Sequence, residues 1–305
     1  MSKERYLQQA ALLLRVLPLL ADEGVFALKG GTAINLFVRD MPRLSVDIDL
    51  TYLPVEGRDV SIAGISHALN KFGDRIKESL PQTRVHRAIG PGRGITGSLV
   101  ISNNNVTIKI EPNFVLRGSV FPCETKELCS AAQKQFSAYT EVTTLSCADL
   151  YGGKLCAMLD RQHPRDMFDA KLLMENEGIS TEIRQAFVIY LASHVRPMHE
   201  LLDPIYLDMR SIFESEFVGM SQIPVSYEDL EAIRREVALR LRADLHNNER
   251  QFLLSVKAGS PAWELLPIPG IDKLPGIQWK LANIAKIERT KHEMQLEKLK
   301  RALEL

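Results

Sequence analysis

The fold of this chain is decided by residues 29–53, which read KGGTAINLFVRDMPRLSVDIDLTYL. A glycine pair opens a short apolar segment that predicts a helix, and an acidic segment follows it. Asp47 and Asp49 alternate with apolar residues in the acidic segment, and this period of two predicts a strand. Both carboxylates therefore lie on one face of that strand, about 6–7 Å apart at their Cα atoms, while the other face is apolar and suits a core.

These two features indicate a nucleotide site. Two neighbouring carboxylates suit Mg²⁺ (or Mn²⁺), because hard cations take oxygen ligands. The turn at Gly30 and Gly31 leads into a helix, so its backbone N–H groups can bind a phosphate. Together the two features predict nucleotidyl transfer from an NTP.

The composition narrows the class of protein. The chain has 305 residues, enough for two domains, and its 45% hydrophobic and 25% charged residues are typical of a globular protein. Lys plus Arg and Asp plus Glu are equal at 38 each, so the net charge does not indicate a polyanionic partner. No apolar run approaches the about 20 residues of a membrane span, so we expect a cytoplasmic protein with no membrane partner. The cysteines have no metal-ligand spacing and are expected to be free thiols: Cys123, Cys129, Cys147 and Cys156.

The pattern along the chain predicts an α+β fold in two domains. Residues 1–145 alternate helices and strands, with a hairpin of 95–101 and 106–111, and predict a mixed sheet flanked by helices. The acidic strand lies in this range, so 1–145 is the candidate nucleotidyltransferase domain. Residues 146–305 predict an α-helical domain with a Pro/Gly-rich loop at 259–276 and a terminal helix at 277–305. The other predicted helices are 3–22, 32–39, 60–80, 146–161, 164–177, 181–192, 204–216, 227–247 and 249–257, and the other strands are 25–28, 46–53 and 84–89.

A third carboxylate is a candidate for the same site. Glu111 ends the predicted strand 106–111, on the face opposite its apolar residues. It can join Asp47 and Asp49 as a ligand or as a base. The alternative is an ordinary surface charge on an exposed hairpin edge.

A second polar group lies downstream in the helical half. Lys154 and Arg161 are seven residues apart and therefore share one helical face, and Asp166 follows in the next helix. One interpretation is a phosphate-facing Lys154 supported by Arg161 and Asp166. The other is a helical hairpin joined by surface ion pairs.

Basic residues on two predicted helices are candidates for an RNA-binding surface, although acidic residues accompany them and a solvated face is the commoner arrangement. They are Arg234, Arg235, Arg240, Arg242, Lys280, Lys286, Arg289, Lys291, Lys298, Lys300 and Arg301.

The two groups of motifs together resemble the AbiEii/AbiGii family of nucleotidyltransferase toxins, which includes the MenT group. The resemblance rests on Gly30-Gly31-Thr32-Ala33, on Arg43-x-Ser45-x-Asp47-Ile48-Asp49-Leu50, and on Lys154, Ala157, Arg161, Arg165-Asp166 and Asp169. It implies a polymerase-beta-type nucleotidyltransferase domain with a helical C-terminal domain. It also implies a toxin paired with an antitoxin encoded nearby, in phage defence or growth control. Relatives add nucleotides to the 3′ acceptor end of tRNA and so block aminoacylation.

The resemblance also assigns roles in the nucleotide site. Asp47 and Asp49 would hold the metal, and Gly30, Gly31 and Thr32 would bind the β- and γ-phosphates. Many nucleotidyltransferases have Gly-Ser where this chain has Gly30-Gly31-Thr32, so the hydroxyl comes from Thr32 or from Ser45.

The remaining candidates have supporting roles. Lys154 would neutralise phosphate charge while an acceptor hydroxyl attacks the α-phosphorus, and Glu111 would activate the acceptor or bind a second metal. Asp166 would orient Lys154 or Arg165, or touch the nucleotide. Arg43 and Ser45 would either steady the acidic strand or contact phosphate.

Two alternatives stay open at this point. The same metal site would serve transfer to a protein or to a small molecule. A non-catalytic nucleotide-binding module is an alternative of a different class.

Overall fold

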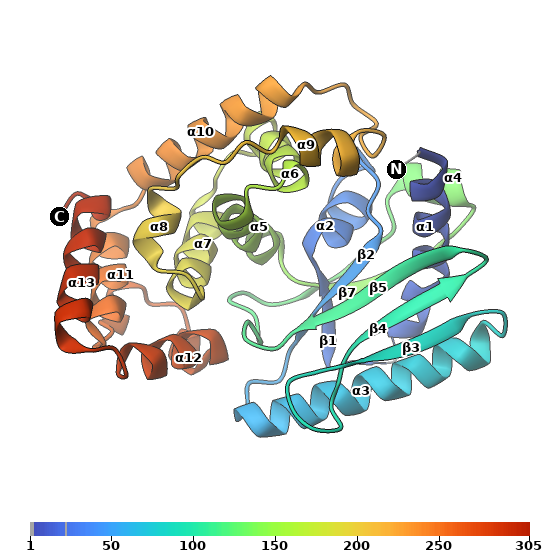
Figure 1. The fold of residues 1–305 in the computed structure, drawn as a ribbon, viewed down its shortest axis with the longest axis horizontal. Helices are drawn as coiled ribbons and strands as arrows, with labels where there is room; N and C mark the ends of the chain where they lie inside the picture. Colours follow the sequence, from blue (N-terminus) through green and yellow to red (C-terminus); the bar gives the residue numbers. More distant parts are fainter. Residues whose placement is uncertain (1–2, 22) are drawn as a thin grey trace. The chain divides into compact units, whose positions relative to one another are not determined.

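The computed structural model describes residues 3–21 and 23–305, drawn in Figure 1. The chain forms two compact units. The first contains Met1–Ser146 together with Glu214–Pro224, and the second contains Cys147–Phe213 and Val225–Leu305. The sequence boundary after residue 145 assigns Glu214–Pro224 to the helical half, whereas the structure includes this segment in the first unit.

A mixed seven-stranded sheet with the order β3-β4-β5-β2-β1-β7-β6 organises the first unit. Its central strand β2 pairs in parallel with β5 on one side and antiparallel with β1 on the other. Ile48 and Leu50 on β2 are fully buried, which confirms the predicted apolar face. The strands are β1 (Phe26–Lys29), β2 (Asp47–Tyr52), β3 (Arg84–Ile89), β4 (Thr96–Asn103), β5 (Val106–Asn113), β6 (Glu124–Glu127) and β7 (Glu141–Thr144).

Helices flank this sheet. Helix α1 (Lys3–Val16) packs along β5, and α3 (Arg58–Ser79) packs along β3 and β4 (Figure 1). The predicted helix 3–22 continues after α1 only as a 3₁₀ turn at Leu17–Leu20, and residue 22 lies outside the described residues. The short helices are α2 (Gly30–Ala33), which continues as a π-helical turn at Ile34–Val38, and α4 (Ser130–Phe136).

The segment Glu214–Pro224 is held in the first unit by backbone pairing. The N–H of Leu44 donates to the carbonyl of Met220 at 2.9 Å, and the N–H of Gln222 donates to the carbonyl of Pro42 at 2.8 Å. Met220 is 1% exposed, so the segment also contributes to the core. It therefore supports the connection that leads into β2.

The second unit is helical. Helices α5 and α7 pack together in it, and Gly152 brings the α5 backbone against Ala186. The helices are α5 (Cys147–Arg161), α6 (Pro164–Glu175), α7 (Thr181–Ser193), α8 (Met198–Leu202), α9 (Arg210–Ile212), α10 (Tyr227–Ala243), α11 (Asn247–Ala258), α12 (Pro275–Ile284) and α13 (Arg289–Leu303). The Pro/Gly-rich segment 259–276 contains two 3₁₀ turns, at Trp263–Leu265 and Ile271–Lys273, and its last two residues already belong to α12.

Two predicted helices differ from the structure. The predicted helix 204–216 was wrong in its first half, because α9 begins only at Arg210, where the Asp208 side chain accepts a hydrogen bond from the Arg210 N–H at 2.9 Å. The predicted helix 277–305 was wrong as one element, since α12 and α13 are separate helices.

Two observations concern the described residues as a whole. No helix there combines the length and the apolar character needed to cross a membrane. The four cysteines lie outside any disulfide, as predicted.

Candidate active site

The glycine turn and the acidic strand are in direct contact. Gly30 follows β1 with φ +71°, in the left-handed region that favours glycine. A Cβ atom at this position would lie 2.4 Å from Asp49 Oδ2, which is far inside van der Waals contact. Only a residue without a side chain therefore lets the turn lie against the Asp49 carboxylate.

Two buried hydroxyl groups join the turn to the strand. The Thr32 hydroxyl donates to the main-chain carbonyl of Asp47 at 2.5 Å and also contacts Ser45 Oγ at 2.9 Å. Thr32 is 1% exposed and Ser45 is buried as well. Both hydroxyls therefore hold the acidic strand in the structure, and the phosphate contacts predicted for them stay predictions.

Arg43 lies behind the second glycine. Its guanidinium is buried and donates to the carbonyl of Leu44 at 3.0 Å. A Cβ atom at Gly31 would lie 2.6 Å from Arg43 Nη2, so Gly31 leaves room for this side chain. Arg43 thus lies between the glycine turn and the entry to the acidic strand, and the two roles predicted for it stay predictions.

The sheet register groups charges around the two aspartates. In the paired strands, Asp47 lies opposite Lys109, and Asp49 lies opposite Glu111 and Lys29. Directly paired residues share one face of a sheet, so these five side chains extend from the same face. Neither Lys29 nor Lys109 was predicted to lie at the site. For Lys109 a signal was available, because Lys109 and Glu111 alternate with apolar residues along 106–111 and therefore share a face.

Glu111 lies beside Asp49 in the sheet, but its carboxylate pairs with Lys109 Nζ at 2.6 Å. In the described part of the chain, no three His, Cys, Asp or Glu side chains gather closely enough to hold a metal ion. Asp47 and Asp49 offer two carboxylates with oxygen donors of the type that Mg²⁺ prefers. Phosphate oxygens and water would complete such a site. The donor set therefore fits a cation that arrives with a triphosphate.

The second polar group is a buried ion-pair cluster. Lys154 on α5 is 6% exposed, and its Nζ lies 2.9 Å from both Asp166 Oδ1 and Asp169 Oδ2 on α6. Both aspartates are fully buried. Asp169 belongs to the quoted motif, but no role was predicted for it. Its i, i+3 spacing from Asp166 was the signal that both face Lys154.

Arg161 completes this cluster from the end of α5. Its Nε donates to Asp166 Oδ2 at 2.5 Å, and its Nη2 donates to Asp166 Oδ1 at 2.9 Å. Burial favours the neutral acid, but the charges of Lys154 and Arg161 outweigh burial and hold the pKa of Asp166 well below its usual range. Asp166 is therefore an anion that orients both cations, and the catalytic role predicted for it stays a prediction.

One family of known proteins matches the chain over most of its length. The family described as "Nucleotidyl transferase AbiEii toxin, Type IV TA system" matches residues 11–283. The chain belongs to the AbiEii family. It is thus a nucleotidyltransferase toxin of a type IV toxin–antitoxin system. No curated protein matches this AbiEii chain by sequence.

One solved structure supports the AbiEii fold. The chain is similar to MenT4, a nucleotidyltransferase toxin from Mycobacterium tuberculosis H37Rv, with a TM-score of 0.60 and 15% sequence identity. The similarity covers 98% of this chain and 99% of that chain. At this identity the likeness concerns the fold alone, and it confirms the predicted mixed sheet flanked by helices with a helical C-terminal half.

The AbiEii motifs therefore fall into two groups in this structure. Gly30, Gly31, Thr32 and Ser45 lie with the two aspartates in the first unit, and Arg43 lies behind them. Lys154, Arg161 and Asp166 form the buried cluster of the second unit. The catalytic and ligand roles of these residues stay predictions.

Proposed function

We propose that this AbiEii toxin transfers a nucleoside monophosphate from an NTP to RNA, at the 3′ acceptor end of tRNA, and thereby blocks translation. The observation that carries the proposal is the contact between Gly30 and Asp49, which makes the glycine turn and the acidic face of β2 one surface. One side of this surface presents N–H groups, and the other presents two carboxylates. A metal-bound triphosphate needs both kinds of group.

In the proposed reaction, an acceptor hydroxyl of the RNA attacks the α-phosphorus of the NTP in line. A new P–O bond forms, the bond from the α-phosphorus to the bridging oxygen breaks, and pyrophosphate leaves with that electron pair. The proton of the hydroxyl passes to a base, for which Glu111 is the candidate. Mg²⁺ (or Mn²⁺) held by Asp47 and Asp49 would supply charge neutralisation to the phosphates.

The protein's own contribution is mainly positioning. The N–H groups after Gly30 and Gly31 bind phosphate oxygens, and the Thr32 hydroxyl fixes the Asp47 backbone beneath them. In the second unit, Asp166 and Asp169 hold the Lys154 amine in one orientation. We also propose that the toxin acts in the cytoplasm, in phage defence or growth control, with an antitoxin encoded nearby as its partner.

Labelled NTPs and total tRNA test this proposal. Each NTP is incubated in turn with the protein, Mg²⁺ and total tRNA, and the label is followed by gel. Label in tRNA supports the proposal. Label in protein or in a small molecule would favour that other acceptor class, and binding without turnover would favour a non-catalytic module and overturn the proposal.

Asp49→Ala gives the matched test of the site. We expect a folded protein that has lost transfer and growth inhibition, because half of the carboxylate pair is gone. Asp59→Ala is the control, since its side chain on α3 is 98% exposed. A folded Asp49→Ala protein that stayed fully toxic would contradict the metal site.

A further inference from the structure

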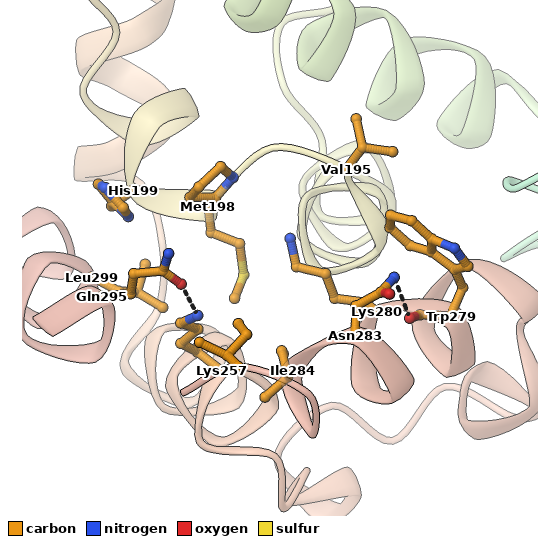
Figure 2. A pocket seen from close by; sticks show the side chains of 12 residues that line it. Val195, Met198, His199, Lys257, Trp279, Lys280, Asn283, Ile284, Gln295 and Leu299 are labelled. Carbon is orange, nitrogen blue, oxygen red and sulfur yellow. Dashed lines mark hydrogen bonds between the residues drawn. The ribbon is translucent and has the colours of Figure 1, made fainter. Parts of the chain in front are cut away.

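A pocket of about 360 Å³ opens in the second unit, outside the cluster of Lys154, Asp166 and Asp169. Figure 2 shows its lining, which comes from the segment before α8, from helices α8, α11, α12 and α13, and from the turn between α12 and α13. Its volume falls in the range of small-molecule sites. None of its lining residues was a candidate for the nucleotide site. Lys280 was a candidate for the RNA-binding surface, but it is buried, so a role for this pocket does not depend on the proposed function.

Two buried lysines reach this pocket from two sides (Figure 2). Lys257 on α11 is 6% exposed, and its Nζ donates to Gln295 Oε1 at 2.6 Å. Lys280 on α12 is 7% exposed, and its Nζ donates to the main-chain carbonyls of His194 at 2.7 Å and Arg196 at 2.9 Å. Among the described residues, no carboxylate lies within ion-pair distance of either amine.

Buried lysines without an acidic partner are unusual in proteins. Each ammonium has three N–H donors, so these contacts leave donors on both side chains for another acceptor. Burial lowers the pKa of Lys257, and it lowers the pKa of Lys280 to about 8, to which the positive charge of Lys257 contributes. Burial is the first cause of both shifts, so both ammonium groups lie where water solvates them poorly.

The surrounding charges do not cancel the positive charge of the two lysines. Burial lowers the pKa of His199, which adjoins the pocket, and the positive charge of Lys298 lowers it further. The negative charge of Glu200 acts in the opposite direction on the pKa of Lys280 and of His199. The same carboxylate also lies 3.4 Å from Arg196 Nε, so it is shared among several cations. The pocket therefore combines two lysines with one shared carboxylate nearby.

The rest of the lining is mainly apolar. Met198, Ile284 and Leu299 are buried and form part of the wall, and the half-buried Trp279 adds an indole ring. An apolar wall with a few convergent polar groups is typical of sites for small organic ligands. The ring of Trp279 offers a flat face for a planar group.

We propose that this pocket binds a small organic phosphate, whose phosphomonoester group lies between Lys257 and Lys280 and whose ring contacts Trp279 and the apolar wall. A phosphomonoester carries up to two negative charges and has three acceptor oxygens. It can therefore match two ammonium groups that line one pocket, whereas a carboxylate brings a single charge. The aromatic part accounts for the apolar wall, which inorganic phosphate would leave without a partner.

Tryptophan fluorescence provides a direct test, because the chain has only two tryptophans, Trp263 and Trp279. In the full-length Trp263→Phe protein, Trp279 is the sole reporter. We expect phenyl phosphate to change its emission saturably and to bind at least about tenfold more tightly than inorganic phosphate or benzoate. AMP in a parallel titration distinguishes a nucleoside phosphate from a smaller ring phosphate.

Charge removal at Lys257 tests the assigned contacts. Lys257→Met in the same background should weaken phenyl phosphate binding by about tenfold or more, since a charge-assisted contact is lost. Lys286→Met is the control, because it removes one exposed positive charge just beyond α12. Lys257→Gln serves the same purpose with a polar side chain, should the methionine variant not fold.

Three results would overturn the proposal. The first is the absence of a saturable Trp279 signal with phenyl phosphate and with AMP. The second is equal affinity for phenyl phosphate and for inorganic phosphate. The third is unchanged affinity in the folded Lys257→Met and Lys257→Gln proteins, which would leave Lys257 with a structural role only.

Discussion

At the scale of single residues, Gly30 carries two requirements at once. Its φ of +71° disfavours any side chain. A Cβ atom added at this position would also lie only 2.4 Å from Asp49 Oδ2. Gly94 shares the first requirement, with φ +74°, but a Cβ atom there would meet no other atom within 4 Å. Comparing a substitution at Gly30 with the same substitution at Gly94 therefore separates the effect of backbone strain from the effect of the contact with the carboxylate.

We expect Gly30→Ala to reduce nucleotide transfer by about a hundredfold, since a displaced carboxylate misplaces the reacting groups. It should also lower the free energy of unfolding by about 1–2 kcal/mol through backbone strain. Gly94→Ala should show the strain without the loss of activity. Transfer assays and urea unfolding of both proteins check this, and equal activity of the two variants would contradict the role of the contact.

The acid response of Asp166 gives a second prediction. Its folded pKa lies below the ordinary value of 3.8, so its ion pairs stabilise the protein above that pH and are lost as the pH falls. Arg161→Met raises the folded pKa and should lower the free energy of unfolding at pH 7 by about 1 kcal/mol or less, because the Arg161 side chain is 58% exposed.

This difference between wild type and Arg161→Met should shrink as the pH falls below about 4. Urea unfolding at several pH values measures it, with Lys286→Met as the control. A difference that stayed constant from neutral to acid pH would show that Arg161 acts by packing alone.

The sequence predicted some of these residues and not others, for a physical reason. Asp47 and Asp49 share a face because a strand has period two, which is a local property. Lys280 and Arg234 were candidates for a basic surface, but both are buried. Arg234 donates to Gln162 Oε1 at 2.8 Å and to the carbonyl of Leu207 at 2.7 Å, so acceptors distant in the sequence decide its burial.

At the scale of elements, helix α5 contains a neighbouring pair of glycines with opposite surroundings. A Cβ atom on Gly152 would lie 2.7 Å from the Ala186 Cβ on α7, whereas the nearest atom to one on Gly153 is 4.0 Å away. Gly152→Ala should therefore destabilise the protein by about 1–3 kcal/mol through overpacking. Gly153→Ala should stabilise it by about 0.5–1 kcal/mol, because alanine favours helix interiors.

Chemical unfolding of the two alanine proteins measures these changes under one set of conditions. Opposite signs are expected. A stabilising Gly152→Ala would mean that α5 and α7 do not approach as closely as described.

Helices and strands with a strong hydrophobic periodicity were predicted from the sequence. Short strands that lack this periodicity were not. The hairpin of β4 and β5 has alternating apolar residues and an asparagine turn, so its own sequence is sufficient to predict it. Strands β6 and β7 have four residues each and were not predicted, because their pairing with each other makes them strands. Pairing of this kind depends on residues far along the chain.

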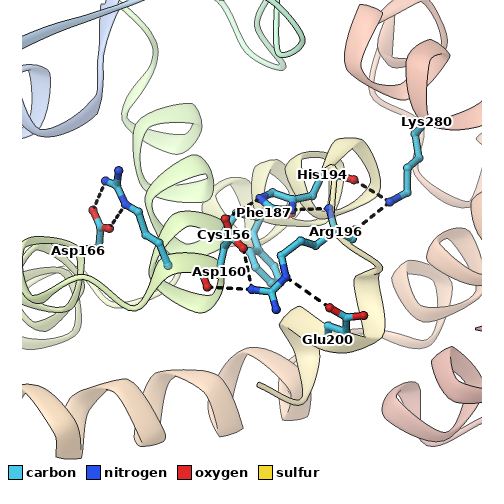
Figure 3. Close-up of polar contacts among 9 residues, drawn as sticks. Cys156, Asp160, Asp166, Phe187, His194, Arg196, Glu200 and Lys280 are labelled. Atoms are coloured by element: carbon cyan, nitrogen blue, oxygen red, sulfur yellow. Dashed lines mark hydrogen bonds and ion pairs between the residues drawn. The ribbon is translucent and has the colours of Figure 1, made fainter. Parts of the chain in front are cut away.

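Figure 3 illustrates a further limit on prediction from helix patterns. Asp160, one residue before Arg161 on α5, accepts hydrogen bonds from Arg196 Nη1 at its side chain (2.9 Å) and at its carbonyl (3.0 Å). Lys280 in turn donates to the Arg196 carbonyl. Consecutive residues of α5 thus take part in two separate polar networks, and the helical periodicity alone indicates neither.

At the scale of the whole molecule, the first unit is discontinuous in sequence, since Glu214–Pro224 belongs to it. Phe217 and Met220 are 2% and 1% exposed, and together they anchor this segment. Residues 1–146 alone should therefore be less stable than the same residues joined by a flexible linker to 214–224. We expect a difference of about 3 kcal/mol, since each side chain buries a large apolar surface.

Thermal and urea unfolding of the two proteins test this, with a scrambled 214–224 segment as the control. Equal stability of the native and scrambled fusions would show that the segment adds nothing to the first unit.

The contact between Gly30 and Asp49 also has a genetic consequence. A cell that escapes its own toxin by mutation can do so through a single codon, because every amino acid other than glycine adds an atom where the carboxylate oxygen lies. Surviving clones should then include missense changes at codon 30 that still produce full-length protein. Selection for survival would thereby identify this position without any assay of the enzyme.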